Sequence, residues 1–302
     1  MPFAQLKIGH TTHADKGTGL TVFLLDTPAT CGYWICGSAP ATRDVTLLDP
    51  SFTVNKTDAL LFTGGSAFGV DAAQGVMRWL QEQGRGFATA HGPEPIVPTA
   101  SIYDFSVKGM AAPTNEDAYQ ACLNASAHLQ AGLIGAGTGT SVGKLSDKAS
   151  PMTGGFGYAQ IECSFGLQVL ACVVVNAIGD IVDQAGNIVA GAVQKNGQFF
   201  NLAQQIQRNE IIHSPLEQQN TTLVAVFTNA HFDKAQLTRV AKMASAGMAR
   251  AINPVFTSYD GAVVFALSLG EQTFDEITVG TVAATAVQQA ILRAVQESSA
   301  IL

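Results

Sequence analysis

The sequence predicts an α/β or α+β fold in which helices cover the faces of β-sheets. Short apolar runs rich in β-branched residues recur along the chain, and three long segments show the apolar spacing of helices. The 302 residues contain no internal repeat and no stretch with the composition of an interdomain linker. We therefore expect a single domain spanning residues 1–302.

Continuous apolar runs of this length are typical of strands that are buried on both faces. The predicted strands, in chain order, are residues 20–25, 33–36, 59–62, 159–163, 169–177, 222–227 and 263–267.

Three segments repeat apolar residues at helical spacing. The first is 68–83, the second is 234–250, and the third is 277–295, which Asp275 and Glu276 open with the acidic charge that suits a helix N-terminus. Residues 201–220 are polar and rich in glutamine, which predicts an exposed loop or an irregular helix. This polar stretch ends at Thr221, where a strand pattern begins.

Charged residues make up only 13% of the chain and hydrophobic residues 47%. Because this charge content is about half that of an ordinary soluble domain, we expect copies of the chain to cover part of the surface in a homo-oligomer. The net charge is −7 and no run of Lys or Arg occurs, so the sequence predicts neither nucleic-acid nor membrane binding.

The five cysteines are scattered and form no CxxC pair, which argues against a disulfide framework or a zinc site. The N-terminus lacks the basic and apolar stretches of a secretory signal, and the longest apolar run, 169–178, is too short to span a bilayer. We expect a protein of the reducing cytoplasm.

A glycine-rich stretch at 135–144 invites comparison with phosphate-binding loops. A Walker loop needs glycine where Thr138 stands and Ser or Thr where Leu145 stands, and the dinucleotide fingerprint also lacks its third glycine. A turn that packs closely against other backbone is the better interpretation. The histidines show no metal-binding spacing and no GxSxG sequence occurs, so we expect no metal, no cofactor and no conventional serine hydrolase.

Asn220-Thr221-Thr222 stands at the head of a predicted strand. Threonine at such a position is usually only a strand former. However, a strained peptide bond before threonine can shift to the hydroxyl, giving an ester that water hydrolyses. The new chain would start at Thr221 with a free α-amine, whose ordinary pKa near 8 lets it act as base for its own hydroxyl.

Ordered sequence motifs resemble those of the L-aminopeptidase D-amidase/esterase family, the DmpA-type peptidases, which include β-peptidyl aminopeptidases and nylon-oligomer hydrolases. They are RD (43–44) with LDP (48–50), LFTGGSAFG (61–69), DAAQGVMRWL (71–80), PIVP (95–98) with IYD (102–104), GAGTGTSVGKL (135–145), VVVNA (173–177) with GD (179–180), NTTL (220–223), KAQL (234–237), ARAINP (249–254), and DG (260–261) with VFALS (264–268).

The resemblance implies an αββα sandwich of the N-terminal-nucleophile (Ntn) hydrolase type, as in the DmpA and ornithine acetyltransferase folds. It implies a precursor that cuts itself between Asn220 and Thr221 into an α chain, 1–220, and a β chain, 221–302, which stay together. Oligomers are usual in the family, which implies a tetramer of such protomers.

The matched motifs also imply site residues. Thr221 matches the family nucleophile, and Asn176 matches an asparagine whose amide helps to hold the oxyanion, a role that suits a neutral donor fixed at a strand end. Tyr103 matches a tyrosine that donates to the oxyanion or the substrate. The alternatives are an asparagine that bonds its own turn and an aromatic residue that only packs.

Lys144 matches a lysine that would lower the pKa of the Thr221 amine by like charge, or it is a solvated turn lysine. Asp260 matches the first member of an acidic pair that some members of the family have, where others have Ser and then Glu, and it would orient the amine or relay a proton. Ala262 stands at the second position. Gly64-Gly65-Ser66 matches a loop that borders the pocket, or forms a tight turn in which Ser66 caps a helix.

The leading hypothesis is a hydrolase of short peptides or amides with a free N-terminal amine, acting through a Thr221 acyl-enzyme. An acyltransferase of the ornithine acetyltransferase type is the second hypothesis, and an uncleaved, non-catalytic homologue is the third, supported by Ala262. The sequence leaves open whether L-, D-, β- or ω-amino-acid amides are the substrates, and it does not give the size of the oligomer.

Overall fold

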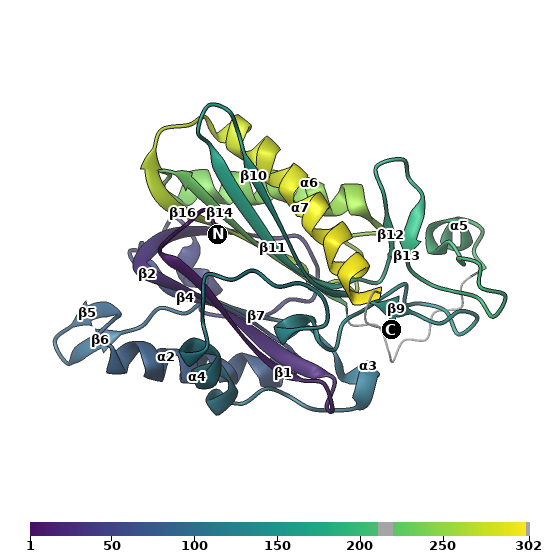
Figure 1. Ribbon diagram of the computed structural model, residues 1–302, viewed down its shortest axis with the longest axis horizontal. Helices are drawn as coiled ribbons and strands as arrows, with labels where there is room; N and C mark the ends of the chain where they lie inside the picture. Colours follow the sequence, from purple (N-terminus) through teal and green to yellow (C-terminus); the bar gives the residue numbers. More distant parts are fainter. Residues whose placement is uncertain (211–219, 300–302) are drawn as a thin grey trace.

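The computed structural model describes residues 1–210 and 220–299. Two β-sheets are stacked face to face, and a pair of helices covers the outer face of each, which gives four layers in the order αββα (Figure 1). The architecture expected from the family resemblance is confirmed.

The first sheet contains β1 (Leu6–His13), the first part of β2 (Thr18–Ile35), β4 (Thr57–Thr63), β7 (Thr99–Ser101) and β3 (Ala41–Arg43), in that spatial order. β1 and β4 are antiparallel to β2, and β7 is parallel to β4.

The second sheet has the order β10 (Gly155–Glu162), β11 (Gln168–Asn176), β14 (Thr221–Ala230), β16 (Val263–Gln272) and the last part of β2. β14 and β16 are parallel, and the other pairs are antiparallel.

The long strand β2 joins the two sheets. It pairs with β4 through residues 20–24 and with β16 through residues 30–35, and the three residues Asp26, Thr27 and Pro28 between these parts are exposed. The prediction of two separate strands at 20–25 and 33–36 was therefore wrong in one respect. They are two parts of one strand. Its pairing with β4 is interrupted at an exposed proline, where the missing N–H costs no ladder bond, and resumes once more at Ala29 before the strand pairs with β16.

The helices α6 (Lys234–Ala251) and α7 (Glu276–Ser299) cover the second sheet, and α2 (Ala73–Glu82) and α4 (Asn115–Leu123) cover the first (Figure 1). Two of the three predicted helices are confirmed, and α4, which Thr114 and Asp117 open with a capping box, was missed.

The predicted helix 68–83 is wrong in its first part. A short α1 (Ser66–Gly69) and a 3-10 turn, η2 (Val70–Ala72), precede α2. A Cβ at Gly69 would lie 1.8 Å from the Gly64 oxygen, so this close backbone approach requires glycine and replaces regular helix at the start of the segment.

Three apolar layers fill the spaces between the four structural layers. Between the sheets lie five fully buried phenylalanines, and Phe23 contacts Phe62 and Phe227 at ring-centroid distances of 5.2 and 5.5 Å. Val224, Val226 and Val264 face α6 and α7 in the second layer, and Val22 and Leu61 belong to the third. Strands buried on both faces account for the continuous apolar runs in the sequence.

A smaller sheet of β13 (Ile188–Ala190), β12 (Asp180–Val182) and β15 (Ile252–Asn253) lies at one end of the sandwich with α5 (Leu202–Gln207). Within the predicted polar segment 201–220, α5 takes 202–207, and residues 211–219 lie outside the described residues. The remaining short elements are η1 (Val45–Leu48), β5 (Phe87–Thr89), β6 (Gly92–Glu94), α3 (Phe105–Lys108), η3 (Gly135–Gly137), β8 (Ser141–Val142) and β9 (Met152–Thr153).

All five cysteines carry free thiols. Across residues 1–210 and 220–299, no helix is both long and apolar enough to cross a bilayer.

Lys234, the first residue of α6, is a buried cation that holds the loop after η1. It is 5% exposed, and its Nζ donates to the carbonyl oxygens of Leu47 at 2.8 Å, Phe52 at 2.9 Å and Asp49 at 3.3 Å. Three hydrogen bonds use all the donors of an ammonium group.

We predict that Lys234→Met lowers the free energy of unfolding by about 1–3 kcal/mol, because it leaves these carbonyl oxygens without their donor in a buried place. Urea unfolding of the intact chain measures the effect. The exposed Lys195, changed to Met, is the matched control and should stay within about 0.5 kcal/mol of the parent. Equal losses in both variants would contradict this role of Lys234.

Candidate active site

Thr221 is the first residue of β14 and lies between two neighbouring strands at their ends. It pairs in register with Asn176, the last residue of β11, and residues 260–261 lie on its other side just before β16. Thr221 is 5% exposed. The strand pairing thus brings the predicted nucleophile and the predicted oxyanion donor next to each other.

The peptide bond before Thr221 is held by backbone on the β16 side. The Asn220 N–H donates to the Tyr259 oxygen at 3.1 Å, and the Asn220 oxygen accepts from the Gly261 N–H at 2.6 Å. Asn220 and Asp260 form a parallel β-bridge. The bond that the sequence predicts to be cut therefore lies extended along residues 259–261.

Gly261 leaves room for the Thr221 side chain. A Cβ placed on Gly261 would lie 2.8 Å from the Thr221 Oγ1 and 2.6 Å from the Ala39 oxygen, so the hydroxyl lies directly against the glycine. Any larger residue there would have to displace one of these atoms.

The Asn176 side chain is fully buried and its orientation is fixed by its partners. Its Oδ1 accepts from the Lys144 Nζ at 2.7 Å and from the Ser141 N–H at 3.1 Å, and its Nδ2 donates to the Tyr103 carbonyl oxygen at 2.8 Å. Because two donors face Oδ1, the amide cannot be flipped. An amide nitrogen carries two N–H groups, so one remains for another acceptor.

Tyr103 joins the site through its backbone. Its carbonyl oxygen holds Asn176, and its half-buried ring meets Phe105 edge to face at a centroid distance of 5.0 Å. The structure thus brings Tyr103 to Asn176.

The Lys144 ammonium lies beneath the surface, although the residue as a whole is partly exposed. Burial lowers its pKa to about 7, and the carboxylates of Asp260 and Asp104 oppose that shift. Its hydrogen bond to Asn176 and its lowered pKa favour a role in the site over that of a solvated turn lysine.

Asp260 is 5% exposed, and its Oδ2 accepts from the Thr257 N–H at 2.7 Å and from the Thr257 hydroxyl at 2.9 Å. Burial raises the pKa of its carboxyl, while the Thr257 hydrogen bonds and Lys144 lower it. Ala262 lies in the apolar layer between the second sheet and its helices. The position at which the family resemblance implies a second acidic residue is therefore part of the core here.

Asp104 is a buried acid to which sequence reasoning gave no role. It accepts from the Thr18 hydroxyl at 2.6 Å and from the Gly65 N–H at 2.8 Å, and burial raises its pKa to about 6. A Cβ on Gly64 would lie 2.0 Å from its Oδ2. Asp104 thus anchors the Gly64–Gly65 turn beside Tyr103. Its place directly after Tyr103 in the matched motif is the signal in the sequence that could have identified it.

The turn Gly64-Gly65-Ser66 has left-handed backbone at two consecutive residues, with φ of 79° at Gly65 and 51° at Ser66. The Ser66 N–H donates to the Ile102 oxygen, and no side chain caps α1. The alternative in which Ser66 caps the helix is therefore wrong, because Ser66 is already the first residue of α1. A left-handed serine is a strained position that needs the surrounding contacts to hold it.

The glycine-rich stretch packs closely against neighbouring backbone, as predicted. A Cβ on Gly139 would lie 1.8 Å from the Gly17 oxygen, and one on Gly143 would lie 2.0 Å from the Ala192 nitrogen. These contacts place Lys144 next to Asn176. Among the described residues, no group of three or more His, Cys, Asp or Glu side chains has the arrangement of a metal site.

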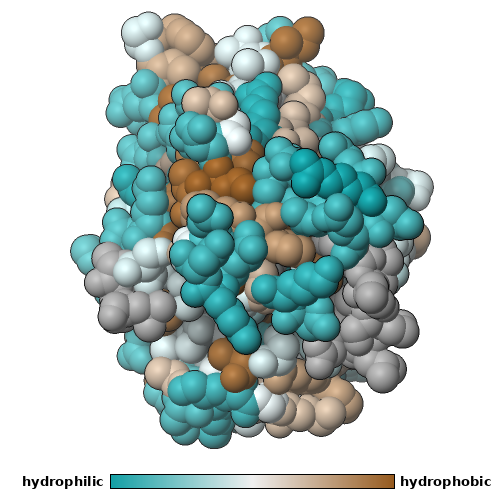
Figure 2. All heavy atoms as spheres, turned by 90° about the vertical axis from the view of Figure 1, so that its right-hand side faces the viewer, coloured by the Kyte–Doolittle hydropathy of each residue, from teal (hydrophilic) through white to brown (hydrophobic). Residues whose placement is uncertain are grey.

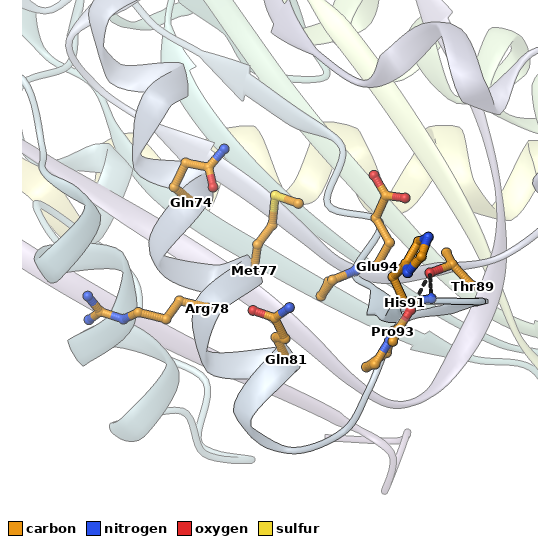
Figure 3. A pocket seen from close by; sticks show the side chains of 10 residues that line it. Gln74, Met77, Arg78, Gln81, Thr89, His91, Pro93 and Glu94 are labelled. Carbon is orange, nitrogen blue, oxygen red and sulfur yellow. Dashed lines mark hydrogen bonds between the residues drawn. The ribbon is translucent and has the colours of Figure 1, made fainter.

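A cavity of about 310 Å³ opens elsewhere, between α2 and the β5–β6 hairpin (Figure 3). Gln74, Met77, Arg78 and Gln81 line it from α2, and Thr89 and residues 91–95 line it from the hairpin and the residue after it. None of the predicted site residues borders this cavity.

Comparisons with known proteins find relatives that are named as peptidases and amide hydrolases. The chain is 40% identical over 285 residues to an uncharacterised aminopeptidase of Mycobacterium leprae, covering 88% of this chain and 76% of that relative. It is 28% identical over 287 residues to a 6-aminohexanoate-oligomer endohydrolase of Agromyces, covering 92% and 76%.

Two solved structures share the fold. A β-aminopeptidase of Burkholderia superposes with a TM-score of 0.72 at 18% identity, and the L-aminopeptidase D-Ala-esterase/amidase of Ochrobactrum anthropi, described as a variant of the Ntn hydrolase fold, superposes with 0.71 at 19%. Each match covers 97% of this chain and 84% of the other. Residues 3–301 match peptidase family S58, and the chain belongs to that family.

Proposed function

We propose that this member of a peptidase family cuts its own chain between Asn220 and Thr221 and then hydrolyses short peptides or amides that carry a free N-terminal amine. The observation that carries the proposal is the placement of the Asn220–Thr221 bond. It is stretched along residues 259–261, beside a hydroxyl packed on glycine and an asparagine amide in register.

Self-cleavage begins when the Thr221 Oγ1 attacks the carbonyl carbon of Asn220. The hydroxyl proton passes to a base, the C–N bond breaks, and its nitrogen takes up a proton to become the α-amine of Thr221. Water then hydrolyses the ester and releases Asn220 as a carboxylic acid. In turnover the same hydroxyl attacks a substrate amide, the amine part leaves with a proton, and water resolves the acyl-enzyme.

Charge develops on the carbonyl oxygen in each of these steps. The second N–H of Asn176 is the donor we assign to the oxyanion in substrate hydrolysis, because its first N–H is taken by Tyr103 and its oxygen is held by Lys144 and Ser141. An amide fixed by three hydrogen bonds needs little reorganisation when the charge appears.

In the mature enzyme the α-amine of Thr221 is the base, with an ordinary pKa near 8. Lys144 lowers that pKa by like charge where it is itself protonated, up to about pH 7. Asp260 orients the amine. Ala262 lies in the core, so any proton relay at this place has to run through Asp260 alone.

We also propose a cytoplasmic homo-oligomer, a tetramer of cleaved protomers by family likeness. Apolar side chains reach the surface among polar ones on the face that carries α5 and β13 (Figure 2), and Val189, Phe199 and Ile206 are exposed apolar residues of that segment. Phe68 and Met110 are 64% and 77% exposed. Such side chains, together with the low charge content, favour contacts between copies.

Thr221→Ala is expected to remain one chain, because no hydroxyl is present to attack Asn220. Intact mass under denaturing conditions, with N-terminal sequencing of any fragment, measures this. The parent, Thr221→Ser and the neighbouring control Thr222→Ala should all give a fragment that begins at residue 221. A parent chain that stays intact through long incubation would sink the proposal.

Asn176→Asp is expected to lower kcat by about 10²–10³, because the carboxylate keeps the acceptor for Lys144 and Ser141 but removes the oxyanion donor. Steady-state kinetics on processed enzyme measure it. Asn229→Asp is the matched control. Asn229, on β14, is buried as Asn176 is, and its side chain likewise accepts a hydrogen bond from a backbone N–H, that of Gln168, and donates one to a carbonyl oxygen, that of Gly166. Similar losses in both variants would remove Asn176 from the mechanism.

Lys144 predicts a pH dependence of stability. Its pKa is about 7 in the fold, against an ordinary value of 10.5, so between these values the unfolded chain binds more protons and stability rises with pH. As the pH rises above 7, the free energy of unfolding of the Thr221→Ala chain should increase relative to that of the double variant Thr221→Ala/Lys144→Met. The increase is at most about 1.4 kcal/mol per pH unit. Urea unfolding at pH 6, 7, 8 and 9 tests this. If the free energy of unfolding varied with pH in the same way with and without Lys144→Met, the lowered pKa of Lys144 would be contradicted. The control Lys195→Met, in the same Thr221→Ala chain, is expected to leave the pH dependence unchanged.

A further inference from the structure

The ester formed during self-cleavage and the acyl-enzyme formed during turnover contain the same bond, a carboxylic ester on the Thr221 Oγ1. In the first, the acyl group is the residue Asn220. In the second, it is the acyl residue of the substrate. If the proposed function holds, both acyl groups are attached to one atom in one buried place, and Asn220 has to leave before substrate enters. The surroundings of Asn220 therefore describe the acyl subsite of the mature enzyme.

The backbone contacts of Asn220 define what that subsite holds. Its N–H donates to the Tyr259 oxygen and its oxygen accepts from the Gly261 N–H, so both partners belong to one β-bridge centred on Asp260. The amine nitrogen and carbonyl of an α-amino acid have the same separation as these two groups of Asn220. A β- or ω-amino acid places additional carbons between them and cannot make both bonds in this register.

The side chain of Asn220 is enclosed and unpaired. Asn220 is 2% exposed, and neither its Oδ1 nor its Nδ2 has a hydrogen-bond partner among the described residues. Buried polar side chains are almost always hydrogen-bonded. The space around Asn220 therefore fits the shape of an asparagine side chain but offers its amide group no hydrogen-bond partner. Leucine has nearly the same branched shape without polar atoms.

We infer that residues 259–261 and the space around the Asn220 side chain form a subsite for a single L-α-aminoacyl group with an apolar, leucine-sized side chain. The substrate amine donates to the Tyr259 oxygen, where the Asn220 N–H donates in the intact chain. The Gly261 N–H binds the acyl carbonyl oxygen, alongside the Asn176 amide. Residues 259–261 thus bind first the precursor and then the substrate.

The test uses the processed parent enzyme with p-nitroanilides of L-leucine, L-asparagine, D-leucine, β-homoleucine and 6-aminohexanoic acid. The L-leucine compound should exceed each of the others in kcat/KM by about 10-fold or more, the range set by leaving a buried polar group unpaired. A preference for the β- or ω-amino compound, or for asparagine over leucine, overturns the subsite while leaving the hydrolase proposal intact. A chain that neither cuts itself nor hydrolyses any of the five overturns both.

A second measurement does not depend on catalysis. In the uncleavable Thr221→Ala chain, Asn220→Leu should raise the melting temperature by roughly 2–4 °C, because it removes two unpaired buried polar atoms and keeps the shape. Asn124→Leu changes an exposed asparagine after α4 and serves as the matched control, with no gain expected. An unchanged or lowered melting temperature in Asn220→Leu would show that the space has a polar partner for asparagine.

Discussion

β14 is buried along its whole length, and the candidate site follows from that constraint. A strand covered on both faces has to satisfy every backbone N–H and C=O within the protein, including those of the residue that leads into it. Asn220 meets this requirement through Tyr259 and Gly261, which extends the parallel pairing of β14 and β16 backwards by one bridge. The Asn220–Thr221 bond is thereby aligned by the same ladder that holds the core.

The polar groups around that bond form a buried network within an apolar sandwich. Lys144 donates to Asn176, Asn176 donates to Tyr103, and Asp104, next along the chain, anchors the Gly64–Gly65 turn. A buried ammonium without partners would be costly, and here two carboxylates and an amide oxygen compensate it in part. The cost that remains appears as the lowered pKa of Lys144, so the network keeps a group that titrates near neutrality.

The sequence was sufficient for the parts of the fold that repeat a pattern. The apolar runs located the long buried strands, and helical spacing located α6 and α7. It was insufficient where tertiary contacts decide the outcome. The continuity of β2 depends on which sheet each part joins, and the break before α2 depends on the approach of Gly69 to Gly64. For the site, motif order selected Thr221, Asn176, Lys144 and Asp260. It gave no sign that the Gly261 N–H holds the Asn220 carbonyl, because a backbone donor leaves no trace in side-chain chemistry.

The two reactions proposed for Thr221 cannot share every catalytic group. In the intact chain the nitrogen of Thr221 is an amide and has no basicity, so the amine that serves as base in turnover does not exist during the first cut. That cut needs another proton acceptor. The acidic pair that the family resemblance implies is reduced here to Asp260, whose Oδ2 is occupied by Thr257. Lys144, with a pKa of about 7 and a direct bond to Asn176, is the basic group nearest neutrality in the network. Self-cleavage that accelerates as the pH passes 7 follows from that assignment, whereas turnover depends on the pKa of the amine that cleavage creates.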